Sequence, residues 1–199
     1  MIQIKDATYK DVDSIVVIHQ QAFPDFFLTT LGEDFLRLYY NCMCKSNGAV
    51  TLCAVEDGKV VGFSTTALKS AGFNTRLIKK DLLKFTGESL KLLFTKPMSL
   101  IRLVKNLTKK GAMVDDNGDY AELYSIGVSP ICQGKGLGSL LLTETEIKVR
   151  QSGEARLSLT TDKNNNESAV AFYQRNGYRI LYEFVAYPDR EMYRFIKGL

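Results

Sequence analysis

The sequence predicts an α/β fold: a mixed, partly parallel, twisted sheet of about seven strands, flanked by helices and carrying a helical insertion between the third and fourth strands. Three observations support this prediction. Seven β-rich segments are separated by turn residues, helical periodicity recurs between several of them, and one long basic segment interrupts the order. With 199 residues, the chain suits a single domain over residues 1–199 that carries one elaboration.

The first part of the chain contains both periodicities. The expected elements are a strand at 1–8, a helix at 12–23, a helix from about 32 to 46, and strands at 49–56 and 59–68. Pro24 stops the first helix because its ring excludes the preceding residue from helical geometry. Asp57-Gly58 between two apolar runs predicts a tight hairpin, because glycine accepts the positive φ of such turns.

Residues 70–118 form the expected insertion. Two stretches with apolar-basic helical periodicity lie near 74–94 and 98–110, divided by Pro97. Between residues 76 and 110 there are ten Lys or Arg residues and only two acids, on a chain whose net charge is +4. A single basic segment is a local feature, so we expect no nucleic-acid partner.

The last part of the chain alternates strands and helices. We expect strands at 120–128, 155–161, 178–187 and 191–196, with helices at 136–151 and 166–176 between the first three of them. Strand, helix and strand in succession favour a partly parallel sheet with right-handed crossovers.

A glycine-rich turn between the strand at 120–128 and the next helix indicates chemistry. Gly134, Gly136 and Gly138 let the backbone turn sharply, and the helix that follows places unpaired N–H groups and its positive dipole end there. We therefore expect a phosphate or pyrophosphate cradle, with Lys135 as a nearby charge. The spacing matches neither G-x-G-x-x-G nor G-x-x-x-x-G-K-[ST].

Two motifs in order resemble the GNAT N-acetyltransferase superfamily. Gln133–Gly138 follows a strand of the form L-x-S-I-x-V-x-P and resembles the family's Q-x-x-G-x-G acetyl-CoA signature. Asn166–Tyr178 resembles its N-x-x-A-x-x-x-Y-x-x-x-G-[FY] helix. The resemblance covers the first two helices, the hairpin and the chain from Tyr120 onward, but not 70–118, because the family usually joins its third and fourth strands by a short connection.

The resemblance implies how acetyl-CoA is bound as cosubstrate. The strand that ends in Ile126, Gly127 and Val128 would pair with the pantetheine arm, and a bulge would separate it from the next strand. An N–H at Ile126 or Gly127 would stabilise the developing oxyanion. The pyrophosphate would be held by the amides of Gln133, Gly134, Lys135, Gly136, Leu137, Gly138 and Ser139, and Asn166 would contact the cofactor arm.

The resemblance also implies the proton-transfer groups. Tyr173 is the candidate general acid for the departing thiolate, although its apolar neighbours also suit a core tyrosine. Glu122 is the candidate general base, unless it is a solvated charge at a strand end. Alternation places Glu122, Tyr124 and Ile126 on one face of the strand and Ser125 on the other, so Tyr124 and Ser125 remain alternatives that the bulge decides.

The cysteines and the single histidine predict no metal site and no covalent intermediate. Cys42 and Cys44 lack a second pair of ligands, and His19 lies within a helix far from them. Cys132 has no neighbouring base to activate it. The N-terminus lacks a secretory signal and no apolar run could span a membrane, so we expect a cytoplasmic protein with reduced thiols.

The sequence therefore predicts an acetyl-CoA-dependent N-acetyltransferase that acts on a small-molecule primary amine, such as an amino sugar or a nucleotide-linked amino sugar, by direct transfer in a ternary complex. The alternative is an acyl-CoA-binding regulatory module whose basic insertion docks an anionic partner or a membrane surface. A protein-lysine acceptor is disfavoured, because a basic insertion would repel it. Homodimer formation is left open.

Overall fold

The computed structural model describes residues 1–82, 85–87 and 116–199. Its seven strands lie in the order β1-β2-β3-β4-β5-β7-β6, and neighbours are antiparallel except for β4 and β5, which are parallel. The strands are β1 (Ile2–Asp6), β2 (Ala49–Glu56), β3 (Lys59–Ala67), β4 (Ala121–Val128), β5 (Arg156–Asp162), β6 (Arg179–Ala186) and β7 (Arg190–Gly198). The predicted partly parallel sheet of seven strands is confirmed.

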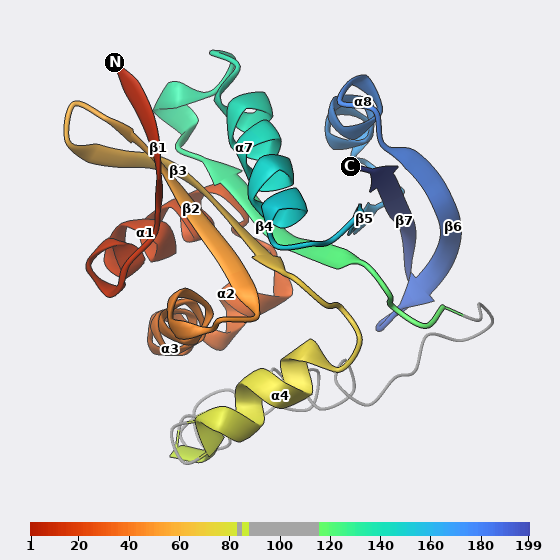
Figure 1. The fold of residues 1–199 in the computed structure, drawn as a ribbon, viewed down its shortest axis with the longest axis horizontal. Coiled ribbons are helices and arrows are strands. Elements are labelled where there is room, and N and C mark those ends of the chain that lie inside the picture. The colour runs from red at the N-terminus through yellow and green to blue at the C-terminus, as the bar shows by residue number, and fades with distance from the viewer. Residues whose placement is uncertain (83–84, 88–115) are drawn as a thin grey trace.

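Helices cover both faces of the sheet (Figure 1). The helices are α1 (Val12–Ala22), α2 (Phe27–Leu31), α3 (Glu33–Lys45), α4 (Phe73–Lys80), α7 (Leu137–Gln151) and α8 (Glu167–Arg175). One apolar cluster joins α1–α4 to β2 and β3, and two others join α7 and α8 to the opposite face. Each amphipathic helix thus buries its apolar stripe against one side of the pleated sheet. None of the described helices is long and apolar enough to cross a membrane.

The expected elements agree with the structure apart from their ends and one short helix. The predicted hairpin turn has the required positive φ at Asp57 (50°) and Gly58 (77°). The sequence analysis did not anticipate α2 as a separate helix. The insertion begins with α4, which buries Phe73 and Leu77 against the α1–α3 layer. Residues 83–84 and 88–94 of the first predicted helical stretch, 74–94, and all of the second, 98–110, lie outside the described residues.

Helix α1 places His19 inside the core. The side chain is 0% exposed, and its Nδ1 lies 2.7 Å from the Tyr40 hydroxyl of α3. The rings of Phe23 and Phe63 lie 5.2 and 6.3 Å from the imidazole, centroid to centroid. Because burial disfavours a charged imidazolium, the pKa of His19 is lowered to about 4.

This burial predicts a pH-dependent stability. The unfolded chain binds a proton at His19 below about pH 6.5, whereas the folded protein binds it only near pH 4. Above about pH 6.5, His19 is neutral in both states and does not reduce the free energy of unfolding. As the pH drops toward 4, the free energy of unfolding should fall by up to about 3 kcal/mol. Urea unfolding at pH 7 and 5 measures this slope, and a His19→Phe variant should lose it because the chain has no other histidine. Equal slopes in both proteins would contradict the assignment.

Candidate active site

Strand β4 contains one residue that β3 does not pair. Thr65 lies opposite Ser125 and Thr66 lies opposite Leu123, so Tyr124 is the extra residue of a β-bulge. A bulge bends its strand and interrupts the alternation of side chains between the two faces. The bulge that the family resemblance implied for this strand is confirmed.

The bulge changes which side chains share a face. Tyr124 packs with the α1–α4 cluster, and Ser125 interacts with the Tyr40 hydroxyl on the same side. Ile126, in contrast, packs with the clusters on the α7 side. Simple alternation, which placed Ile126 on the same face as Glu122 and Tyr124, is therefore wrong beyond the bulge, because two consecutive residues of a bulge point the same way.

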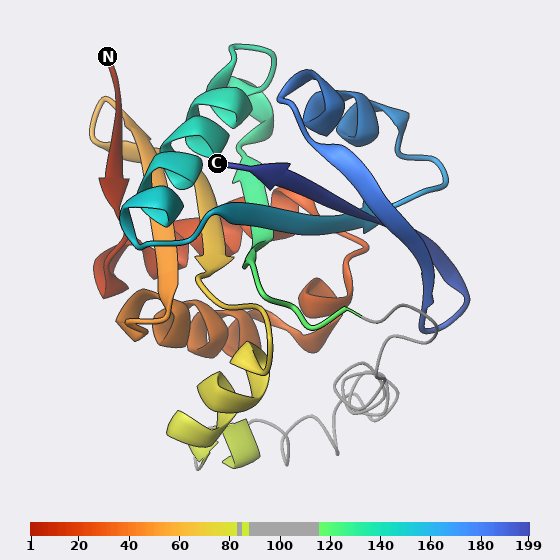
Figure 2. The ribbon, with the colours of Figure 1, turned by 45° about the vertical axis from the view of Figure 1, so that its right-hand side comes forward.

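Strands β4 and β5 separate soon after they begin. The ladder contains three residue pairs, in which Ala121, Glu122 and Leu123 lie opposite Leu157, Ser158 and Leu159. Beyond these pairs the two strands run in different directions (Figure 2). The edge of β4 that contains Ile126, Gly127 and Val128 thus has no partner on β5, and an extended ligand arm could pair with it as an added strand.

The glycine-rich turn leads from this edge into α7. Gly134 and Gly136 have φ values of 77° and 78°, a left-handed geometry that glycine adopts without penalty. A Cβ atom at either position would meet nothing within 4 Å, so this side of the turn is open. Gly136 is the N-cap residue of α7 and no side chain caps the helix, which leaves the N–H groups of Leu137–Ser139 available to an anion. The turn therefore fits a pyrophosphate group.

Two longer side chains flank the turn. The Gln133 amide donates a long hydrogen bond of 3.4 Å to the Val128 carbonyl oxygen, at the end of the unpaired edge. Lys135 is exposed between the two left-handed glycines. Contacts of either side chain with the cofactor remain predictions.

Helix α8 packs directly against the start of α7. A Cβ atom at Gly138 would lie 3.4 Å from the Phe172 ring, so the glycine allows the two helices to approach closely. Asn166 precedes α8, and its Nδ2 donates to Thr161 Oγ1 at 2.5 Å and to the Asp162 carbonyl oxygen at 3.0 Å. The Asn166 amide nitrogen thus holds the turn between β5 and α8. The predicted contact of Asn166 with the cofactor arm would have to use its Oδ1 atom.

Tyr173 lies on α8 among aromatic rings. Its ring centroid is 5.1 Å from Phe172, 5.9 Å from Tyr178 and 6.0 Å from Phe195. Burial raises the pKa of the Tyr173 hydroxyl, so the group stays protonated at neutral pH. Within the described part of the chain this hydroxyl has no hydrogen-bond partner. Tyr173 is therefore partly buried against the core, and its hydroxyl is an unengaged proton donor among the described residues.

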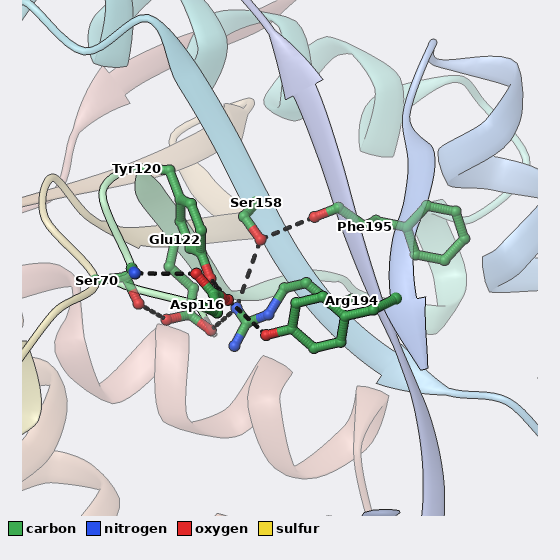
Figure 3. Close-up of polar contacts among 9 residues, drawn as sticks. Ser70, Asp116, Tyr120, Glu122, Ser158, Arg194 and Phe195 are labelled. Atoms are coloured by element: carbon green, nitrogen blue, oxygen red, sulfur yellow. Dashed lines mark hydrogen bonds and ion pairs between the residues drawn. The ribbon is translucent and has the colours of Figure 1, made fainter. Parts of the chain in front are cut away.

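Beyond the three residue pairs, β4 and β5 diverge and leave a wedge-shaped gap between them. Glu122 lies at the closed end of this wedge, where the two strands are still paired. The side chain is buried, and each carboxylate oxygen has its own donor (Figure 3). Oε1 accepts a hydrogen bond of 2.5 Å from Arg194 Nη1, and Oε2 accepts one from the Ser70 hydroxyl. The alternative interpretation of Glu122 as a solvated strand-end charge is therefore wrong.

Sequence patterns did not predict that Arg194 and Asp116 lie next to the site. Arg194 belongs to β7, and its guanidinium lies 5.5 Å from the centre of the Tyr120 ring. Asp116, just before β4, accepts hydrogen bonds from the Tyr120 and Tyr182 hydroxyls. An arginine between apolar residues in the last strand was the available signal, because a charge on an inward-facing strand position needs a partner.

A pocket of about 720 Å³ lies at the opposite end of β4 from the glycine-rich turn. Its charged lining consists of Lys69, Arg76, Lys80, Asp119 and Glu154. The lining includes neither Tyr124 nor Tyr173, so this is not where a thioester and an amine would meet. The pocket borders the site through Phe73, whose ring centroid lies 5.8 Å from that of Tyr124.

An open wedge between parallel strands, followed by an amide cradle at a helix start, defines the class of acyltransferases that bind a CoA thioester. The model of the acetyltransferase (GNAT) family matches residues 12–178, and the chain belongs to this family. The match confirms the predicted family and the acyltransferase class and, at the level of the family, acetyl-CoA as cosubstrate.

Solved structures share the fold over the whole chain. The ribosomal-protein-S18-alanine N-acetyltransferase of Escherichia coli aligns with a TM-score of 0.63 and 17% identity, over 100% of this chain and 94% of that one. The PaiA N-acetyltransferase of Thermoplasma acidophilum in complex with coenzyme A aligns at 0.61 and 14%, over 100% and 99%. The yncA protein of Salmonella typhimurium with acetyl-CoA aligns at 0.63 and 16%, over 100% and 94%.

A curated relative matches a shorter stretch. The uncharacterised protein YdhI of Bacillus subtilis (strain 168) is 37% identical over 54 residues, which are 27% of this chain. The match spans 33% of that protein, about a third of its length.

The cradle predicts a ligand-dependent stability. Coenzyme A at a hundredfold excess over its Kd should raise the free energy of unfolding by about 2.7 kcal/mol. Gly136→Glu should abolish this gain, because it places a carboxylate where the diphosphate would lie. Gly153→Glu is the matched control, since Gly153 also has a positive φ (89°) and open space but lies beyond the far end of α7. Thermal shifts that respond to coenzyme A equally in both variants would refute the cradle.

Proposed function

We propose that the protein transfers the acetyl group of acetyl-CoA to the primary amine of a small molecule, by direct transfer in a ternary complex. The observation that carries the proposal is the continuity of the open β4 edge with the uncapped start of α7. A thioester arm and its diphosphate need these two features in this order. The four cysteines, all among the described residues, form no disulfide, which suits the cytoplasmic location that we propose with it.

Backbone groups would bind and polarise the thioester. Acetyl-CoA supplies an activated acetyl group, and its pantetheine arm would pair with the edge at Ile126, Gly127 and Val128. An N–H of Ile126 or Gly127 would then donate to the carbonyl oxygen as it gains negative charge. A preorganised donor of this kind contributes about 3 kcal/mol to the step.

Tyr173 would protonate the departing thiolate of coenzyme A. Its place on α8, next to the Phe172 ring that packs on Gly138 at the start of α7, supports this role. Because burial raises the pKa of the hydroxyl, Tyr173 carries its proton when the thioester arrives.

Glu122 would take a proton from the acceptor ammonium, directly or through a water molecule, so that the neutral amine can attack the thioester carbonyl. The carboxylate lies on the same face of β4 as Tyr124, two residues before the bulge. Its two hydrogen bonds leave further lone pairs for a third donor. Tyr124 and Ser125 share this face after the bulge and remain the alternative proton acceptors.

An amino sugar or a nucleotide-linked amino sugar is the acceptor class that we favour, because the neighbouring helix α4 carries three basic residues. Arg76 of α4 is close enough to oppose the rise in the pKa of Tyr124 that burial causes. Lys79 and Lys80 are exposed on the same helix. These charges suit an acceptor with an anionic group, and they would weaken the binding of a lysine-rich protein.

An amine panel with coenzyme A release as the readout tests the function. It contains amino sugars, nucleotide-linked amino sugars, polyamines and lysine peptides, each at low and high salt. We expect turnover with a small-molecule amine, and for anionic acceptors a KM that rises with salt because screening weakens exposed charge pairs. Coenzyme A binding without turnover of any amine would favour the regulatory module.

Tyr173→Phe should lower kcat by about 100-fold, the usual contribution of a general acid, while the KM for acetyl-CoA changes little. Tyr178→Phe is the matched control, because it removes the hydroxyl of a neighbouring ring that bonds Glu146 instead. Steady-state kinetics of both variants measure the difference. Full turnover of Tyr173→Phe would remove Tyr173 from the mechanism.

Glu122→Gln should lower kcat/KM most at low pH, where neutral amine is scarce and assisted deprotonation matters most. The wild-type value should rise with pH as neutral amine accumulates. Profiles from pH 6 to 9, with the folded fraction recorded at each point, measure this. A small loss that is uniform across the profile would transfer the role to Tyr124, Ser125 or bulk water.

A further inference from the structure

Arg194 is the least expected charge in the sheet. Its side chain is 14% exposed and lies in β7 between Tyr193 and Phe195. Burial is the largest influence on its guanidinium and lowers the pKa, but the charge of Glu122, its hydrogen bond and the Tyr120 and Tyr182 phenols together raise the pKa, so Arg194 stays charged. A buried cation is tolerated only where it is paired and hydrogen-bonded.

The contacts of Arg194 converge on one carboxylate. Its Nη1 donates to Glu122 Oε1 at 2.5 Å and lies 3.5 Å from Ser158 Oγ (Figure 3). Arg194 lies opposite Thr160 of β5, while Glu122 lies opposite Ser158. The ion pair therefore crosses β5 where that strand begins to leave β4.

Both ends of the insertion meet the same group of side chains. Ser70, just after β3, donates to the second oxygen of Glu122. The backbone N–H of Ser70 donates to the Tyr120 carbonyl oxygen, and Asp116 binds the hydroxyls of Tyr120 and Tyr182. Glu122 is thus held from β7 on one side and from the start of the insertion on the other.

We propose that Arg194 is a positioning residue that orients the Glu122 carboxylate at the closed end of the wedge, with Ser70 fixing its second oxygen. The inference rests on the proposed function and deepens it, because it assigns a task to a residue remote from the cradle. If the Arg194–Glu122 ion pair only stabilised the sheet, its loss would not change the pH dependence of the reaction. If Arg194 positions the proposed base, its loss should change that pH dependence.

The surroundings of Glu122 determine the sign of the effect. Among the described residues, the charged and titratable groups on the elements around it are Arg194 from β7, Tyr124 from β4, Tyr39 from α3, Tyr120 and Asp116 from the segment before β4, Tyr182 from β6, and Arg76 from α4. Arg194 is the cation in direct contact. Its removal leaves a buried carboxylate beside phenols, which favours the protonated form and moves the titration to higher pH.

The experiment measures the titration of Glu122 and the enzyme's pH profile together. Carbon-13 NMR of labelled glutamate follows the carboxylate, identified by its loss in Glu122→Gln. Coenzyme A release with the best amine of the panel gives kcat/KM from pH 5 to 9. Both are recorded for wild type, Arg194→Met, Arg194→Lys and Ser70→Ala. Lys197→Met is the matched control, since it breaks a partly buried ion pair of β7, with Glu146 at 2.7 Å, on the other face of the sheet.

We expect Arg194→Met to move the Glu122 titration and the acid limb of the profile to higher pH by about one unit or more, with the KM for acetyl-CoA unchanged within twofold. Arg194→Lys keeps a positive charge at this position, so both curves should lie close to those of the wild type. Ser70→Ala removes one hydroxyl, so it should fold and should move both curves the same way by less. Lys197→Met should move neither.

Two results would overturn the inference. One is a Glu122 titration that stays unmoved in Ser70→Ala and, where that variant folds, in Arg194→Met. The other is a loss of kcat/KM that is equal at every pH and matches that of Lys197→Met. Failure of the proposed function is a separate outcome: Glu122→Gln would then keep full activity, whatever the Arg194 variants do to the titration of Glu122.

Discussion

Tyr124 stands in β4 without a partner residue in β3, and the arrangement of the site follows from this bulge. A strand with an extra residue bends, and β4 here parts from β5 after three pairs. The parting frees the backbone edge that the cofactor arm requires. The same extra residue turns Tyr124 and Ser125 to one face, so that polar groups gather on the side opposite α7.

The two faces of the sheet consequently carry different tasks. On one face, α7 presents its uncapped start and α8 packs against it through Gly138 and Phe172. On the other face, α1, α3 and α4 surround the polar residues of β4. Under the proposed function, the cofactor arm would lie along the β4 edge in the gap between β4 and β5, and the amine would reach the thioester from the side of α1, α3 and α4.

The buried pair of Glu122 and Arg194 stands where the gap closes. A pair in this setting contributes little net stability, because desolvation of both charges offsets their attraction. Its value lies in geometry instead, since it fixes one carboxylate oxygen, and Ser70 fixes the other. Ser70 and Asp116 border the insertion, so the base of that segment is built into the same polar group of side chains.

Local signals in the sequence were sufficient to predict the strands of the sheet and the glycine-rich turn. Periodicity and turn residues predicted the seven strands, and the spacing of Gly134, Gly136 and Gly138 predicted the cradle, because each depends on the backbone preferences of neighbouring residues. Tertiary structure alone decided the face of Ile126 and the partner of Glu122. The first depends on pairing with β3, and the second joins residues 72 positions apart across β5. Neither a strand register nor a long-range ion pair leaves a mark in local sequence, since both arise only when separate strands are brought together.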